Sequence, residues 1–186
     1  MKRIAIFASG TGSNAEILIR HFELHLDAQV TLLISNKPDA GALKIAAEYG
    51  VETMVVDREQ FFSSRSVLDE LKVRAIDLIV LAGFLWKVPE ILILAYRNRI
   101  VNIHPALLPK FGGKGMYGKH VHAAVLAAGE KESGITIHYV NENFDEGNHI
   151  VQFACAVDAG DTIETLAAKV QRLEHEHFAS AIERLL

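Results

Sequence analysis

The chain has 186 residues, about the length of one domain, and half of them are apolar, which is enough for a sizeable core. Its net charge of -4 gives no reason to expect nucleic acid or a membrane surface as a partner. Its single cysteine, Cys155, excludes an internal disulfide and favours a reducing compartment, the N-terminus lacks the form of a signal peptide, and no apolar run reaches the ~18 residues of a membrane span. We therefore expect a soluble, cytoplasmic, single-domain protein.

Up to about Lys110, short runs of Val, Ile and Leu alternate with helical segments. The runs are nearly continuous in apolar residues, which is typical of parallel strands covered by helices on both faces. We expect strands over 3–8, 30–34, 52–56, 78–81 and 100–103, and helices over 14–22, from a cap at Asp39 to about Tyr49, over 67–73, and from Pro89 onward.

The pattern changes after this point. A glycine-rich loop over 111–118 precedes a short helix over 121–128, and two strands over 136–140 and 150–156 flank a polar, turn-rich segment that suits a hairpin. Thr162 is placed to cap a final helix. The predicted fold class is α/β: a Rossmann-like, open, mostly parallel twisted sheet with helices on both faces, followed by an antiparallel hairpin and a last helix, in one domain over 1–186.

A glycine loop, Ser9 to Ala15, lies between the first strand and the first helix. Glycines allow close approach of the backbone, and a helix N-terminus offers unpaired N–H groups, so the loop predicts a phosphate site. A tight turn without a ligand is the plain alternative. The string also fits the dinucleotide fingerprint, but the second strand ends in Ser35-Asn36-Lys37 without the acid that would hold a ribose.

A second group of polar residues lies at the carboxyl end of the fifth strand, the edge where open α/β sheets bind ligands. Asn102 and His104 are two residues apart, so their side chains leave an extended strand in the same direction. An amide can stabilise an oxyanion and an imidazole can move protons near neutral pH. Asp145, in the polar segment of the hairpin, could orient His104 and raise its pKa. The alternative is that His104 only binds a backbone carbonyl.

Several strings, taken together and in this order, resemble the folate-dependent formyltransferases, and among them the phosphoribosylglycinamide formyltransferases. The resemblance covers essentially the whole chain. Its strings are Gly10-Thr11-Gly12-Ser13-Asn14, Ile34-Ser35-Asn36-Lys37, Leu81-Ala82-Gly83-Phe84, the run from Asn102 to Pro109, the run from Gly134 to Tyr139, Asp145-Glu146-Gly147, and Gln171 with Glu174-His175.

The resemblance implies transfer of a formyl group from 10-formyltetrahydrofolate to the amine of 5-phosphoribosylglycinamide, in purine synthesis. It implies a phosphate-binding part over about 1–100 and a folate and catalytic part over about 101–186. By the same resemblance, His104 donates a proton and polarises the formyl group, Asn102 holds the oxyanion, and Asp145 raises the pKa of His104. The implied substrate-binding residues are Gly12, Ser13, Asn14 and Glu174; those for folate are Leu85, Trp86, Lys87, Val88 and Asn102, with the loop 140–145; and His138 lies beneath the site.

One departure from the family pattern stands out: Trp86 occupies a position where arginine is often found. No metal is predicted, because the pairs His120/His122 and His175/His177 have a spacing that points the rings to different sides of a helix. The alternatives are another formyltetrahydrofolate-dependent transferase or hydrolase, an NAD-dependent oxidoreductase, and a phosphate- or folate-binding module without catalysis. The partners expected are small molecules only.

Overall fold

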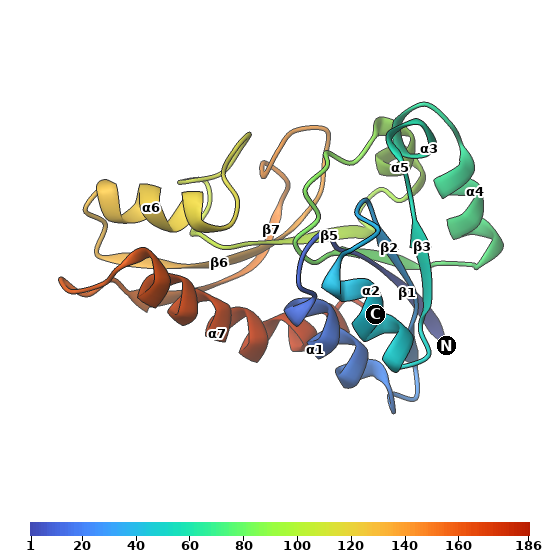
Figure 1. Ribbon diagram of the computed structural model, residues 1–186, viewed down its shortest axis with the longest axis horizontal. Coiled ribbons are helices and arrows are strands. Elements are labelled where there is room, and N and C mark those ends of the chain that lie inside the picture. Colours follow the sequence, from blue (N-terminus) through green and yellow to red (C-terminus); the bar gives the residue numbers. More distant parts are fainter. The chain divides into compact units, whose positions relative to one another are not determined.

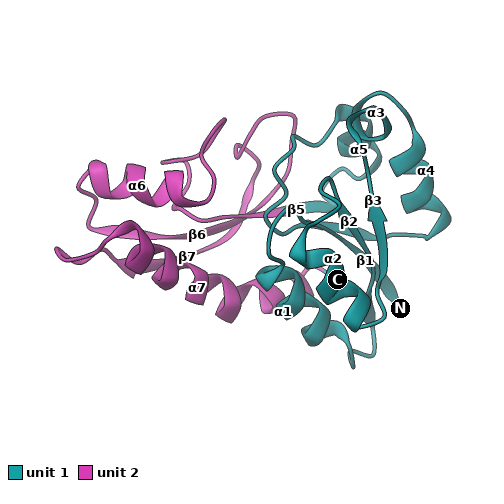
Figure 2. Ribbon diagram, viewed as in Figure 1, with its two compact units in different colours: residues 1–101, 186 teal, residues 102–185 magenta.

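Parallel strands and helices alternate along the first half of the chain, as the apolar runs predict. The structure, a computed structural model, describes residues 1–186 and divides into unit 1, residues 1–101 with Leu186, and unit 2, residues 102–185 (Figure 2). Unit 1 contains β1 (Lys2–Phe7), α1 (Ser13–Phe22), β2 (Ala28–Ser35), α2 (Gly41–Glu48), β3 (Glu52–Val55), α3 (Arg58–Phe62), α4 (Ser66–Val73), β4 (Leu78–Leu81) and α5 (Glu90–Ala95).

The chain passes from unit 1 into unit 2 within a strand, β5 (Ile100–His104). Unit 2 then contains α6 (Lys119–Ala127), β6 (Glu132–Tyr139), β7 (His149–Ala156) and α7 (Ile163–Glu183). The strands form one seven-stranded sheet in the order β3-β2-β1-β4-β5-β6-β7, labelled in Figure 1. The predicted class, a mostly parallel α/β sheet with a C-terminal hairpin and a last helix, is confirmed.

The parallel strands of unit 1 owe their position to burial. β1 pairs in parallel with β2 on one side and β4 on the other, and β2 pairs with β3. Ile4, Ile6, Leu32 and Ile79 are fully buried, and each such side chain contributes about 1.5–3 kcal/mol to folding. Figure 1 shows α1 with α2, and α3 with α4 and α5, as two groups separated by these strands.

The hairpin of unit 2 is antiparallel, with Ile135 opposite Phe153, and α7 packs on both of its strands. Helix α7 begins with a capping box in which Thr162 accepts from the backbone N–H of Thr165, so the predicted cap is confirmed. β6 begins four residues before the predicted strand, because Glu132, Ser133 and Gly134 hide its start in the sequence. No helix has both the length and the apolar character needed to cross a bilayer.

The prediction that Asp39 caps the second helix is wrong. Helix α2 begins at Gly41 with Ala40 at its N-cap and has no side-chain cap. The start of the helix is instead fixed against the glycine loop, since the N–H of Ala42 donates to the Gly10 carbonyl at 3.2 Å. Helix α3 was not predicted, because five residues are too few to show a helical period.

Candidate active site

The candidate site in unit 2 is built around the end of β5. Asn102 is half-buried there and His104 is 3% exposed. The amide Nδ2 of Asn102 donates to Nε2 of His138, on β6, at 3.2 Å. Asp145 lies between the two histidines, with one carboxylate oxygen 3.6 Å from Nδ1 of His104 and the other 3.6 Å from Nε2 of His138. The structure thus brings the three predicted catalytic residues together with His138.

Asp145 is held in place by backbone geometry as well as by charge. Its φ is +56°, in the left-handed region, which aspartate adopts more readily than most residues. The backbone N–H of Gly113 donates to its carboxylate at 2.9 Å. A Cβ at Gly112 would lie 3.2 Å from the Cβ of Asp145 and 2.6 Å from a methyl of Leu108, so a larger residue there would displace one of these side chains.

Hydrogen bonds to backbone carbonyls fix the tautomers of both histidines. Nδ1 of His138 lies 2.9 Å from the Tyr139 carbonyl, so its hydrogen is on Nδ1 and its Nε2 can accept from Asn102. Nε2 of His104 donates to the Phe111 carbonyl at 2.7 Å. In neutral His104 the lone pair of Nδ1 therefore faces Asp145. A second proton, on Nδ1, would make the ring an imidazolium that forms an ion pair with the Asp145 carboxylate.

Burial decides the protonation of His104. The pKa of His104 is lowered from 6.5, because loss of solvation outweighs the attraction of Asp145 and the bond to Phe111, both of which raise it. Asp145 therefore acts in the predicted direction, but the net shift is downward, since 104 is among the most buried polar positions of the chain. Burial opposes ionisation of Asp145, yet the two histidines, when protonated, and the Gly113 N–H together lower its pKa from 3.8.

A third buried histidine, besides His138, lies near His104. His122, on α6, is 5% exposed, and its Nδ1 has no hydrogen-bond partner. Burial lowers the pKa of His122, and the nearby His104 lowers it further. Burial and the neighbouring imidazole therefore both favour the neutral form of His122.

The chain that follows His104 is held by one hydroxyl group. Thr136, on β6, is fully buried and its Oγ1 accepts from the Leu108 N–H at 3.0 Å and from Gln152 Nε2 at 2.8 Å. The same hydroxyl donates to the Ala106 carbonyl at 2.7 Å. This network sets the direction in which the backbone leaves β5, and hence where the Phe111 carbonyl meets His104.

In unit 1, the predicted phosphate loop has the geometry of a tight strand-to-helix turn. Gly12 is the N-cap of α1 with φ +92°, and a Cβ there would lie 2.5 Å from Cα of Ala42. Helix α1 starts at Ser13, so the first N–H groups of its backbone follow directly on this glycine. Such groups and the helix dipole favour an anion.

The predicted folate segment, Leu85 to Val88, follows β4 and belongs to unit 1. The N–H of Leu85 donates to Oγ of Ser9 at 3.0 Å, and Val88 is buried. Trp86 is half-buried in an aromatic cluster, within 5.5 Å of the ring centroids of Phe61 and Phe62, and the Arg58 guanidinium lies 5.6 Å above it. The side chain that departs from the family pattern therefore packs into the protein.

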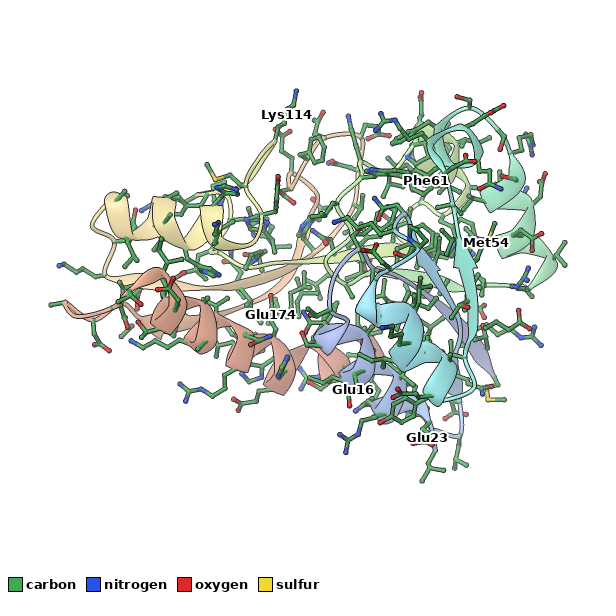
Figure 3. The ribbon with its side chains drawn as sticks, viewed as in Figure 1. Glu16, Glu23, Met54, Phe61, Lys114 and Glu174 are labelled. Carbon is green, nitrogen blue, oxygen red and sulfur yellow. The ribbon has the colours of Figure 1, made fainter.

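The remaining predicted residue, Glu174, lies on α7 of unit 2 (Figure 3). Figure 3 also labels Phe61, the member of the aromatic cluster that lies on α3. Sequence reasoning missed the Phe111 carbonyl and the Gly113 N–H, because backbone groups carry no sequence signal. It named Ser9 only as the first residue of the glycine loop, because the contacts of Ser9 depend on three strand ends meeting. No three His, Cys, Asp or Glu side chains are grouped so as to hold a metal ion.

Comparison with known proteins identifies the class to which this fold and site belong. The sequence model of the family described as Formyl transferase matches residues 2–182, and the chain belongs to the formyl transferase family. Relatives that the chain matches over nearly its whole length include proteins named phosphoribosylglycinamide formyltransferase. That of Bacillus subtilis is 35% identical over 191 residues, which cover 100% of this chain and 95% of the relative.

Two further comparisons agree. The chloroplastic phosphoribosylglycinamide formyltransferase of Arabidopsis thaliana is 40% identical over 97% of this chain, and the chain spans 64% of that relative's length. The crystal structure of phosphoribosylglycinamide formyltransferase from Bacillus halodurans has a TM-score of 0.89 and 39% identity, covering 100% of this chain and 95% of that one. The family suggested by the sequence motifs is confirmed.

Proposed function

We propose that the chain transfers the formyl group of 10-formyltetrahydrofolate to the amine of 5-phosphoribosylglycinamide, a step of purine synthesis. The observation that carries this proposal is one connected set of contacts in a chain of the formyl transferase family: Asn102 bonds His138, and the Asp145 carboxylate lies 3.6 Å from a ring nitrogen of His138 and 3.6 Å from one of His104. The relatives' names supply the substrate, and the site supplies chemistry that suits acyl transfer.

The reaction begins when the amine nitrogen attacks the formyl carbon. The carbonyl oxygen becomes an oxyanion, which the amide N–H of Asn102 stabilises; one hydrogen of that amide goes to His138 and the other remains for substrate. The bond from carbon to folate nitrogen then breaks. The attacking amine loses a proton and the leaving nitrogen gains one, so tetrahydrofolate and the formylated amide are the products, and the chemistry requires no metal and no covalent enzyme intermediate.

His104 is the proton donor of this scheme. Its Nε2–H, which donates to the Phe111 carbonyl, can turn to the formyl oxygen, and Asp145 stabilises the imidazolium that a proton on Nδ1 creates. The lowered pKa of His104 in the free protein is compatible with this role. The oxyanion adds a negative charge that favours the imidazolium, and this charge is present only when the tetrahedral intermediate forms. Asp145 also passes protons to and from water.

The binding roles are part of the same proposal. Gly12, Ser13 and Asn14 hold the phosphate of the glycinamide substrate, supported by the left-handed N-cap and the start of α1. Glu174 binds the same substrate. Folate is held by Leu85, Trp86, Lys87 and Val88, with Asn102 and the loop 140–145; because Trp86 packs inward, backbone groups of this segment make the pterin contacts.

We also propose that the chain acts in the cytoplasm, with its one cysteine free.

The direct test mixes the purified protein with 10-formyltetrahydrofolate and follows folate product by absorbance, with and without phosphoribosylglycinamide. Turnover only with the glycinamide is the expected result. Turnover without it would replace the transferase with a hydrolase, and folate binding without turnover would replace it with a binding module or another formyl acceptor. An NAD-dependent reaction is disfavoured, since Asn36 at the end of β2 is bonded to Ser9 and no acid is present for a ribose.

A further inference from the structure

Ser9 joins three strand ends of unit 1 through a single side chain. It lies two residues after the end of β1 at Phe7 and is 3% exposed. Its Oγ donates to Oδ1 of Asn36, just beyond β2, at 2.6 Å, and accepts the Leu85 N–H, just beyond β4, at 3.0 Å. Its own backbone N–H donates to the Gly83 carbonyl at 3.1 Å.

The direction of these bonds is fixed by the number of hydrogens available. A serine hydroxyl has one hydrogen and two lone pairs. Asn36 offers an acceptor oxygen and takes the hydrogen, so a lone pair of Ser9 is left to face the Leu85 N–H. Asn36 therefore orients the hydroxyl, and the hydroxyl orients Leu85. Neither side chain has a place in the chemistry proposed above.

We infer that Ser9, oriented by Asn36, is a positioning residue for folate: it fixes the backbone of Leu85 to Val88 in the conformation that binds the pterin. This inference rests on the proposed function. The segment needs such support, because it follows Gly83, whose φ is +73°, and because Leu85 itself is 45% exposed and gains little from burial. Ser9 donates its N–H to the carbonyl of Gly83 and accepts the N–H of Leu85, so it holds the turn from both sides.

The glycine loop is held separately. Gly12 packs on Ala42, and the Ala42 N–H donates to the Gly10 carbonyl, so loss of the Ser9 hydroxyl leaves the predicted phosphate loop in place. The two substrates should therefore respond differently. Removal of the hydroxyl leaves a partly buried N–H without its acceptor, and such a loss weakens binding roughly tenfold.

The test uses Ser9→Ala, with Thr162→Ala as the matched control. Thr162→Ala also deletes one hydrogen-bonding hydroxyl, at the start of α7, where it caps a helix. We expect Ser9→Ala to raise the KM for 10-formyltetrahydrofolate roughly tenfold, with kcat and the KM for phosphoribosylglycinamide within about threefold of wild type. The control should change none of the three by more than that.

The only tryptophan of the chain, Trp86, reports on the segment without any substrate. In Ser9→Ala its fluorescence should become more open to quenching by acrylamide and shift to longer wavelength, and Asn36→Ala should change it in the same direction. Because both variants break one chain of bonds, the double variant should bind tetrahydrofolate no more weakly than Ser9→Ala alone.

The outcomes separate this inference from the proposed function. A wild-type protein that neither binds nor uses folate would overturn both. A wild-type protein that uses folate, with Ser9→Ala unchanged in folate KM and in Trp86 quenching, would overturn the positioning role alone. Equal losses in kcat and in both KM values would also overturn it, since that result describes a general loss of structure.

Discussion

Replacement of Asp145 by asparagine tests the electrostatic half of the site while keeping its shape. The amide can still accept the Gly113 N–H, so the loop should keep its position. What is lost is the charge 3.6 Å from Nδ1 of His104. Both side chains are largely shielded from water, at 4% and 12% exposure, so the loss is felt at a low effective dielectric.

The size of the effect follows from that distance. At 3.6 Å and an effective dielectric of about 20, the attraction between an imidazolium and a carboxylate amounts to about 4.6 kcal/mol. It acts only on the protonated form of His104, which the oxyanion-forming step requires. With partial compensation by the new amide, and a tenfold change for each 1.36 kcal/mol, we expect kcat/KM to fall about a thousandfold.

The assay is steady-state turnover from pH 5.5 to 8.5, and the control is Glu146→Gln. That variant removes a negative charge from the neighbouring residue, which bonds Asn143 and neither histidine. In Asp145→Asn the pKa of His104 falls further, because the attraction that raises it is gone. Activity that depends on a protonated His104 is present below its pKa, so the descending limb of the profile should move to lower pH. A variant within threefold of wild type across this range would refute the electrostatic role of Asp145.

Three further outcomes are expected. His104→Ala should lower kcat by roughly 10²- to 10⁴-fold, the usual contribution of a general acid or base, in single-turnover assays at saturating substrate; near-normal turnover would remove His104 from the mechanism. Gly12→Ala should destabilise the protein in urea by about 1–2 kcal/mol for its left-handed φ and by about 1–3 kcal/mol more for the overlap with Ala42, and an unchanged midpoint would contradict that packing. Burial lowers the pKa of His122 in the folded chain, whereas the unfolded chain binds a proton below about pH 6.5, so stability is lost as the pH falls below that value. His122→Leu should weaken this loss in thermal melts at pH 5.5 and 8, and an equal slope would contradict it.

The sheet of unit 1 could be predicted from sequence because its strands are apolar on both faces. Leu78 to Leu81 is buried at every position, and the predicted strand matches β4 at both ends. The limits of other elements depend on contacts that the local sequence does not show. Asp39 looks like a helix cap, but the N-cap of α2 is Ala40, and a Cβ at Gly41 would lie 2.6 Å from the Thr11 carbonyl oxygen, which belongs to a loop distant in the sequence.

The side chains of the site were predictable in identity but not in their electrostatic balance. The motif with Asn102 and His104 indicates acyl chemistry, and the spacing places both on one side of a strand. The sign of the pKa shift of His104 depends on how deeply its ring is buried, which only tertiary packing decides. Likewise, the sequence offers catalysis and a bond to a backbone carbonyl as alternatives for His104. In the structure Nε2 of His104 bonds the Phe111 carbonyl while Nδ1 faces the Asp145 carboxylate, so the two alternatives do not exclude each other.

The hydroxyl of Thr136 provides a way to follow local opening of unit 2 by hydrogen exchange. Its hydrogen and both lone pairs are in use, so the Leu108 N–H that it accepts cannot meet water unless the strand, the turn after His104 and the Gln152 side chain separate together. Exchange of that one amide with deuterium therefore measures the free energy of a concerted opening of the region, rather than the fraying of a loop. A label read at Leu108 would report whether the surroundings of His104 open as one cooperative element or in pieces.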